Sequence, residues 1–254
     1  MTKTAITLIG NGKMALALAH GLKDRYDLEV IGRSAKRLAH FETALGVSVQ
    51  KTLYSEASCT NKTLIVCVKP ANLGEVSAQL YGKATAVYSV LAGTSLASLR
   101  AIDAHHYVRA MPNLAAEKAL SMTALVGDME LRDDAIALFS SIGSSVWLSS
   151  EKELDIATAL SGSGPAYLAL IAEALCDGAV REGLKREDAM TLMRGLFQGF
   201  GELIQTTHPA ILKDNVMSPG GTTAAGYGAL ERANVRLGCM EAIHCAHERA
   251  KGMK

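Results

Sequence analysis

A short apolar segment followed directly by a glycine-rich turn begins the chain and restricts its fold more than any other feature. Residues 5–9, Ala-Ile-Thr-Leu-Ile, have the composition of a strand buried on both faces of a sheet. The turn Gly10-Asn11-Gly12-Lys13-Met14-Ala15 matches the pattern G-x-G-x-x-G/A. The first glycine allows a tight turn, the second lets a pyrophosphate approach, and the small last residue lets the next helix pack on the strand. Because the pattern joins a strand to a helix, it predicts a dinucleotide site at residues 10–14.

The second expected strand, residues 28–31, ends without the acidic residue that binds the ribose of NAD in such sites. The chain continues there as Gly32-Arg33-Ser34-Ala35-Lys36-Arg37. A guanidinium binds a phosphate through two hydrogen bonds, whereas a carboxylate in that place would repel it. Arg33 and Ser34 therefore favour NADPH as cofactor, with NADH as a second cofactor that the sequence leaves open. A solvated basic start to a helix is the alternative interpretation.

Strands and helices alternate up to residue 148, which predicts an α/β domain with a parallel sheet. The expected strands are 5–9, 28–31, 63–68, 86–90, 106–110, 122–126 and 145–148, and the expected helices are 13–23, 35–45, one from 72, 95–102 and 132–142. In such a sheet, ligands lie beyond the carboxyl ends of the strands. The cofactor-binding candidates in those loops are Val68, Lys69, Pro70, Asn72, Ala92, Gly93, Met111 and Asn113. We expect Lys69 to position the cofactor or simply to be exposed, and not to act as a base.

The second half of the chain has helical spacing and no strand pattern, so we expect domains at 1–150 and 151–254. The segment 161–167, Ser-Gly-Ser-Gly-Pro-Ala-Tyr, should interrupt the first helix, with a kink at Pro165. A later helix carries a stripe of bulky apolar residues, namely Met190, Met193, Phe197, Phe200 and Ile204. Such a stripe is usually core, but in so small a region part of it is better explained as a homodimer interface.

A second turn-rich segment, Ser218-Pro219-Gly220-Gly221-Thr222-Thr223, predicts a binding site for a small acid. Pro219 and the two glycines break the chain, so a new helix should begin near Thr222. The unpaired N–H groups and positive dipole end of a helix N-terminus favour a carboxylate, and three hydroxyls surround them here. An ordinary capped helix is the alternative.

Composition and charge exclude several classes of protein. Lys and Arg number 26 against 25 Asp and Glu, without a basic block, so no nucleic-acid partner is expected. Five cysteines without C-x-x-C spacing argue against disulfides and zinc, and His244, Cys245 and His247 fit no standard metal site. We expect a cytoplasmic protein without metal or signal peptide, and without the ~18-residue apolar run of a membrane helix.

Together these segments resemble the Δ1-pyrroline-5-carboxylate reductase family, the NAD(P)H-dependent enzymes of the last step of proline biosynthesis. The resemblance covers essentially the whole chain and rests on residues 10–15, 68–70, 109–113, 159–167, 212–216 and 218–223. It implies a Rossmann-type dinucleotide-binding domain followed by an all-helical domain that interlocks into a dimer, from which higher homo-oligomers can be built. The two implied domains and the implied dimer agree with what the residues themselves predict.

The resemblance also implies a substrate and the residues that bind it. Hydride transfer to the cyclic imine of Δ1-pyrroline-5-carboxylate would give L-proline. The substrate-binding residues would be Ser218, Gly220, Gly221, Thr222 and Thr223. The backbone amides at 221–223 would hold the carboxylate, and the Thr223 hydroxyl, as the catalytic group, would lie beside the ring nitrogen.

Departures from the family pattern follow residue 113, where Leu114-Ala115 replaces Thr-Pro and residues 117–119, Glu-Lys-Ala, replace glycines. A β-hydroxyacid dehydrogenase, the nearest rival among enzymes, would carry a lysine where Leu168 follows Gly162-Ser163-Gly164, so the missing lysine argues against that class. Two alternatives remain, namely an NADP-binding sensor or scaffold without turnover and a reductase of a related cyclic imine.

Overall fold

The computed structural model describes residues 3–251, which form two compact units. The first unit contains the residues up to Ser163 together with those from Cys245 onward, and the second contains Gly164–His244. The outer ends of the two expected domains, residues 1–2 and 252–254, lie outside the described part of the chain.

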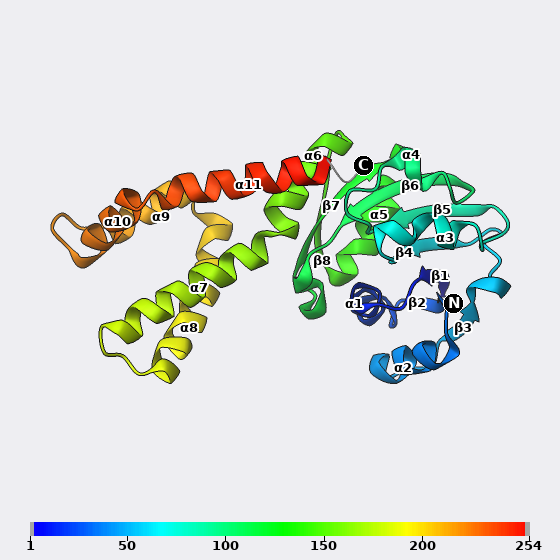
Figure 1. Ribbon diagram of the computed structural model, residues 1–254, viewed down its shortest axis with the longest axis horizontal. Coiled ribbons are helices and arrows are strands. Elements are labelled where there is room, and N and C mark those ends of the chain that lie inside the picture. The colour runs from blue at the N-terminus through cyan, green and yellow to red at the C-terminus, as the bar shows by residue number, and fades with distance from the viewer. Residues whose placement is uncertain (1–2, 252–254) are drawn as a thin grey trace. The chain divides into compact units, whose positions relative to one another are not determined.

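The first unit is built on a sheet of eight strands within residues 3–251, in the order β3-β2-β1-β4-β5-β6-β7-β8 (Figure 1). The strands are β1 (Thr4–Ile9), β2 (Tyr26–Gly32), β3 (Gln50–Leu53), β4 (Thr63–Val66), β5 (Ala84–Ser89), β6 (Ala104–Met111), β7 (Ser121–Gly127) and β8 (Gly143–Trp147). The strands from β1 to β6 pair in parallel, which confirms the α/β prediction. β7 runs antiparallel to β6, because the short connection at 112–120 cannot carry the chain back across the sheet.

Helices cover both faces of this sheet. They are α1 (Lys13–Leu22), α2 (Ala35–Leu45), α3 (Leu73–Ser77), α4 (Leu96–Leu99), α5 (Arg132–Phe139) and α6 (Glu151–Ala157). Short 3₁₀ helices and one π-helix lie between the other elements. The 3₁₀ helices are η1 (Tyr54–Glu56), η2 (Pro70–Asn72), η3 (Leu114–Lys118), η4 (Met129–Leu131) and η5 (Ser140–Ile142), and the π-helix is η6 (Thr158–Gly162). Successive strand residues point to opposite faces, so Leu8 packs under α1 and α5 while Ile9 packs under α3 and α4.

A buried glutamate lies in the sheet at the middle of β2. Glu29 is 7% exposed. Its carboxylate accepts hydrogen bonds from Thr7 Oγ1 at 2.8 Å, Thr52 Oγ1 at 2.8 Å and Lys62 Nζ at 2.6 Å. Burial alone would raise the pKa of Glu29, but these donors outweigh it and hold the pKa below its ordinary value.

The second unit consists of helices. These are α7 (Gly164–Arg181), α8 (Arg186–Thr206), α9 (Pro209–Val216), α10 (Thr222–Arg232) and α11 (Val235–Lys251), which continues into the first unit. The interruption predicted at 161–167 starts within the π-helical η6 and ends before Gly164, where α7 begins. Pro165 falls in the first turn of α7, where its missing N–H costs nothing, and the kink expected at Pro165 stays a prediction.

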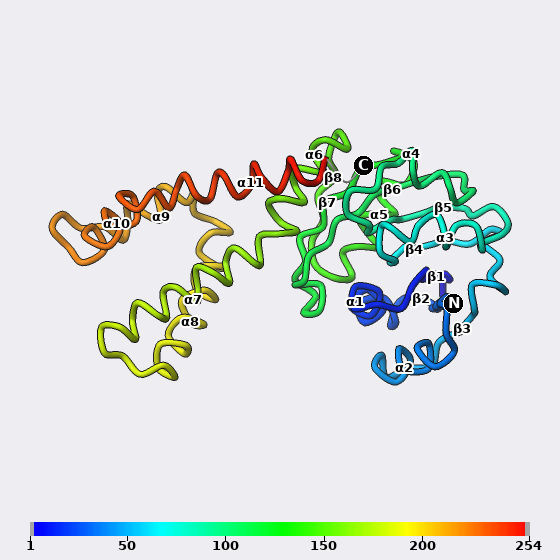
Figure 2. Tube along the Cα trace, viewed as in Figure 1, coloured from blue at the N-terminus to red at the C-terminus, as the bar shows by residue number. Residues whose placement is uncertain are grey.

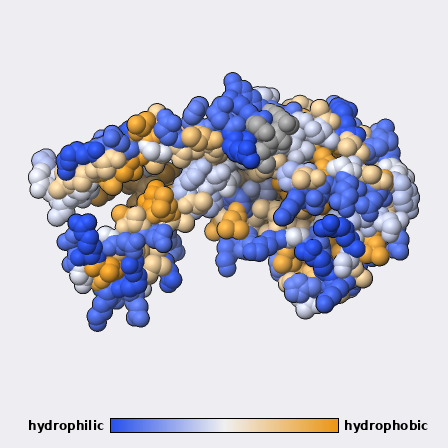
Figure 3. All heavy atoms as spheres, in the orientation of Figure 1, coloured by the Kyte–Doolittle hydropathy of each residue, from blue (hydrophilic) through white to orange (hydrophobic). Residues whose placement is uncertain are grey.

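The second unit has very little core of its own. Within residues 164–244 only Cys176 and Ala189 are buried, where α7 packs against α8. Apolar side chains are exposed over this unit, as Figure 3 shows. They include Leu168, Leu170, Ile171, Leu175, Leu192, Leu196, Phe200, Leu203, Ile204, Ile211, Leu230 and Leu237. Within the predicted stripe, Met190, Met193 and Phe197 are half-buried and Phe200 and Ile204 are exposed. These faces need a covering from outside the monomer.

One helical segment of the described residues could span a membrane by length and composition alone, against expectation. It is Glu151–Arg181, in which a stretch of 18 residues has a mean hydropathy of 1.2 and is 17% buried. No uninterrupted apolar run marks this segment in the sequence, because small residues at 161–164 divide it.

Candidate active site

A cleft lies at the carboxyl ends of β1, β2 and β4, where the strand order reverses between β1 and β4. Its volume is about 430 Å³, and its lining is Gly10, Asn11, Gly12, Arg33, Arg37, Tyr54, Cys67, Val68, Lys69, Asn72, Glu75 and Val76. Ligands of open α/β sheets bind at this topological position. The fold therefore brings together seven of the predicted cofactor residues, namely 10, 11, 12, 33, 68, 69 and 72.

The two glycines have different roles in the turn. Gly10 has a φ of +109°, and a Cβ there would lie 3.1 Å from the carbonyl oxygen of Cys67. Gly12 is the N-cap of α1, and a Cβ there would meet nothing within 4 Å because it would point into open space. The first turn of α1 carries no acidic residue. A backbone open to the cleft at a helix N-terminus fits the pyrophosphate of a dinucleotide.

Positive charge gathers at one end of the cleft. Arg33 follows β2 and Arg37 lies in the first turn of α2. Ser34 is the N-cap of α2, but its side chain makes no capping hydrogen bond. Glu75 of α3 faces Arg33, with 4.0 Å between Oε1 and Nη1. This end of the cleft suits an anionic group that accepts hydrogen bonds from guanidinium.

Four residues that line the cleft were not predicted from the sequence, namely Tyr54, Cys67, Glu75 and Val76. Burial raises the pKa of both the Tyr54 hydroxyl and the Cys67 thiol, so both groups stay neutral at pH 7. Glu75 lies three residues after the candidate Asn72 on the same helical segment, and that spacing is the signal that could have identified it. Tyr54 lies in a segment for which no element was expected.

The remaining cofactor candidates lie outside the lining of the cleft, and their roles stay predictions. They are Lys13, Met14, Ser34, Pro70, Ala92, Gly93, Met111 and Asn113. Asn113 is held by hydrogen bonds of both its side chain and its backbone. Its Nδ2 donates to the Ser161 carbonyl at 3.1 Å, its Oδ1 accepts from the Ala115 amide at 3.0 Å, and its own amide donates to Ser121 Oγ at 3.0 Å. The 111–113 loop is thereby joined to the η6 turn.

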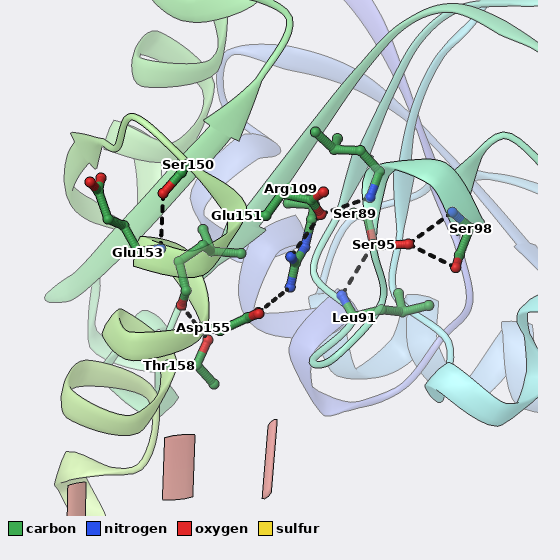
Figure 4. A network of polar contacts seen from close by, with 12 residues as sticks. Ser89, Leu91, Ser95, Ser98, Arg109, Ser150, Glu151, Glu153, Asp155 and Thr158 are labelled. Atoms are coloured by element: carbon green, nitrogen blue, oxygen red, sulfur yellow. Dashed lines mark hydrogen bonds and ion pairs between the residues drawn. The ribbon is translucent and has the colours of Figure 1, made fainter. Parts of the chain in front are cut away.

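A buried charge cluster is centred on Arg109, two residues before this loop in the chain (Figure 4). Arg109 of β6 is 1% exposed and points toward α6, where Nη1 donates to Glu151 Oε1 at 2.9 Å and Nη2 to Asp155 Oδ1 at 3.0 Å. Glu151 Oε1 also accepts the amide of Leu96 at 2.8 Å. The cluster ties β6, α4 and α6 together. Sequence reasoning quoted Arg109 within a motif without giving it a role.

The predicted acid-binding segment lies in the second unit, between α9 and α10, where Figure 2 shows it as an orange loop. Gly220 has a φ of +72°, and the Gly221 amide donates to the Ser218 carbonyl at 3.0 Å, which closes the turn. α10 begins at Thr222, as predicted, and Thr222 and Thr223 are both exposed. The first turn of α10 contains no acidic residue. This helix N-terminus fits a carboxylate, and the role of each residue stays a prediction.

Comparison with known proteins gives matches along the whole chain. A family model described as pyrroline-5-carboxylate reductase dimerisation matches residues 151–253, and one described as NADP oxidoreductase coenzyme F420-dependent matches residues 5–93. The pyrroline-5-carboxylate reductase of Helicobacter pylori strain J99 is 33% identical over 248 residues, which cover 94% of this chain and 96% of that protein. The Arabidopsis thaliana enzyme of the same name is 35% identical over 262 residues, which cover 97% and 94%.

Solved structures agree with these matches. A 1-pyrroline-5-carboxylate reductase from Streptococcus pyogenes has a TM-score of 0.87 at 30% identity, and covers 98% of this chain and 99% of that chain. A Plasmodium falciparum pyrroline carboxylate reductase with NADP bound has a TM-score of 0.81 at 26% identity, and covers 100% and 99%. A reductive aminase from Aspergillus terreus, at 16% identity and a TM-score of 0.57 with coverage of 99% and 92%, shares the fold alone.

Proposed function

Because this chain belongs to the pyrroline-5-carboxylate reductase family, we propose that it reduces Δ1-pyrroline-5-carboxylate to L-proline with NAD(P)H. It is thus an oxidoreductase of the last step of proline biosynthesis. The observation that carries this function is the full-length match to reductases of this name, in a chain whose dinucleotide cleft has an open Gly12 and the N-terminus of α1.

The cofactor is a nicotinamide dinucleotide, and NADPH is the preferred form in this proposal. The pyrophosphate would lie against Gly10 and Gly12, and Arg33 with Ser34 would bind the 2′-phosphate. Lys69 and Asn72 would hold the ribose and phosphates on the β4 side of the cleft. The loops at 92–93 and 111–113 would contact the nicotinamide, which supplies the hydride when bound.

The residues of the second unit would bind and polarise the substrate. In this proposal the amides at Gly221, Thr222 and Thr223 surround the carboxylate, with Ser218 and Gly220 shaping the turn. The Gly221 amide must share its hydrogen bond with the Ser218 carbonyl, so Thr222 and Thr223 would contribute most. The Thr223 hydroxyl would donate to the imine nitrogen, which makes the neighbouring carbon electrophilic. Holding the reacting atoms about 3–3.5 Å apart would supply most of the rate acceleration.

The test is NADPH oxidation at 340 nm with Δ1-pyrroline-5-carboxylate, run beside NADH and a blank. We expect turnover that is faster with NADPH. Thr223→Val should lower kcat by about 10²-fold, a typical loss for a proton donor, and leave NADPH affinity unchanged. Thr43→Val on the exposed face of α2 is the matched control. Full activity of Thr223→Val would exclude the role of Thr223, and NADPH binding without turnover would favour the sensor or a related imine substrate.

The protein is a homo-oligomer through its dimerisation domain, and we propose a homodimer as the unit of any higher assembly. Two buried residues cannot stabilise the second unit alone, so a second copy would cover its apolar faces together with the rest of the segment Glu151–Arg181. In this proposal that segment contacts protein and no membrane, and residues 1–150 and 151–254 form the two domains. Light scattering after gel filtration tests the dimer.

All five cysteines are free, the state that a reducing cytoplasm maintains.

A further inference from the structure

The carboxylate of Glu75 lines the cleft, although no acidic residue follows β2. Glu75 lies in the first turn of α3, on the β4 side of the Gly10–Gly12 turn. Arg33 follows β2 on the other side of that turn, because β1 lies between β2 and β4 in the sheet. The two side chains nevertheless approach to 4.0 Å. The cleft therefore holds both signs of charge at one end.

The position of Glu75 is fixed by the helix that carries it. Leu73 and Val76, its neighbours on α3, are 6% and 2% exposed and pack into the core beneath the sheet. The Glu75 side chain itself is 55% exposed and that of Arg33 is 56% exposed. An ion pair this accessible is weak, so either partner can exchange the other for a ligand.

The two cofactors differ at this end of the cleft in a single group. NADH presents a ribose 2′-hydroxyl, which can donate to a carboxylate, as in sites where an acidic residue ends β2. NADPH presents a phosphate in its place, which a guanidinium binds and a carboxylate repels. Arg33 and Arg37 therefore favour NADPH, and Glu75 opposes them.

We infer that Glu75 is a specificity-determining residue that supports NADH and weakens NADPH. Its carboxylate accepts a hydrogen bond from the ribose of NADH, and it separates from Arg33 when a 2′-phosphate enters. This inference rests on the proposed dinucleotide site. Glu75 of α3 thus replaces the acidic residue that is missing after β2, so that the same cleft accepts both NADH and NADPH.

The test measures binding of the adenosine end alone, with the full-length protein and no turnover. Isothermal titration calorimetry with 2′,5′-ADP and with 5′-AMP compares the wild type with Glu75→Gln. We expect 2′,5′-ADP to bind about 3- to 10-fold more tightly, because one repulsive charge is removed at short range, and 5′-AMP to bind about 2- to 5-fold more weakly. Glu130→Gln, an exposed glutamate of η4 outside the cleft, changes the net charge equally and should change neither affinity.

The outcomes separate this inference from the proposed reaction. An unchanged ratio of the two affinities in Glu75→Gln would overturn it, as would an equal change in Glu130→Gln. Glu75→Asp keeps the negative charge and controls for a local change of structure. It should keep at least half of the repulsion that Glu75 exerts on 2′,5′-ADP in the wild type. Fragment binding as expected, in a protein without pyrroline-5-carboxylate turnover, would overturn the proposed reaction and leave this inference standing.

Discussion

Removal of the Asp155 carboxylate should destabilise the first unit strongly, because a buried guanidinium depends on it. Arg109 and Asp155 are 1% and 2% exposed, so water cannot replace the lost hydrogen bond of 3.0 Å. Breaking a buried pair by deleting one partner costs about 3–5 kcal/mol. Glu151 still neutralises Arg109 in the variant, although its side chain is 31% exposed. We therefore expect Asp155→Leu to lower the free energy of unfolding by about 2–4 kcal/mol, somewhat less than the loss of a buried pair without such a neighbour.

The double variant Arg109→Met/Asp155→Leu separates the worth of the pair from the cost of an unpaired charge. Replacing both buried groups with apolar side chains of similar volume is often neutral or stabilising. The double variant should therefore be more stable than Asp155→Leu alone, and the double-mutant cycle should show a coupling of about 2 kcal/mol or more. Additive losses would show that the cluster stabilises the fold by packing and not by charge pairing.

The assay is urea unfolding at one fixed protomer concentration, because the stability of a homo-oligomer depends on concentration. The control is Asp133→Asn at the exposed start of α5, which should change stability by no more than about 0.5 kcal/mol. If Asp155→Leu costs no more than this control, the argument from burial is refuted.

Three further predictions concern other parts of the molecule. The pKa of Glu29 is below its ordinary value of 4.5 in the folded protein, so its stabilisation is present above pH 4.5 and is lost as the pH falls through the lowered pKa. Glu29→Gln should therefore destabilise the protein at pH 7 and flatten the acid limb of a plot of stability against pH, and an unchanged limb would contradict this. Ala119 has a φ of +56°, a conformation that costs a residue with a Cβ about 1 kcal/mol, so Ala119→Gly should raise the urea midpoint, and a lower midpoint would refute the strain. Leu192, 64% exposed on α8, should lie in the dimer interface, so Leu192→Glu should give monomers in light scattering, whereas an intact dimer would place the interface elsewhere.

The sequence predicted the parts of the fold that depend on neighbouring residues. The turn at residues 10–15 and the buried strands on either side of it are visible because their chemistry lies within a few positions of one another. β3 was missed because Gln50 and Lys51 are exposed and give no apolar pattern. The strand β7 was predicted at residues 122–126, but its antiparallel direction was not, because direction depends on a connection whose length is clear only when the strand ends are known.

The site could be predicted only where one segment provides it. Glu75 and Arg33 come from separate helix and strand ends, and only the strand order brings their carboxylate and guanidinium together. The partners of Arg109 lie 42 and 46 residues further along the chain, so no local pattern identifies them. Pairings of this kind depend on how distant elements pack together, and no local pattern in one sequence shows which of their residues will meet.

The distribution of core between the two units predicts that the cleft and the segment 218–223 depend differently on a second copy of the chain. The cleft at residues 10–76 belongs to a unit with a full core on both faces of its sheet, so its geometry does not depend on a second copy. The segment at 218–223 belongs to a unit with two buried residues, so we expect its helices to be held in place by a second copy that covers their apolar faces. Adenosine fragments should therefore bind to a monomer, whereas alignment of a substrate by Thr222 and Thr223 should require the assembled protein.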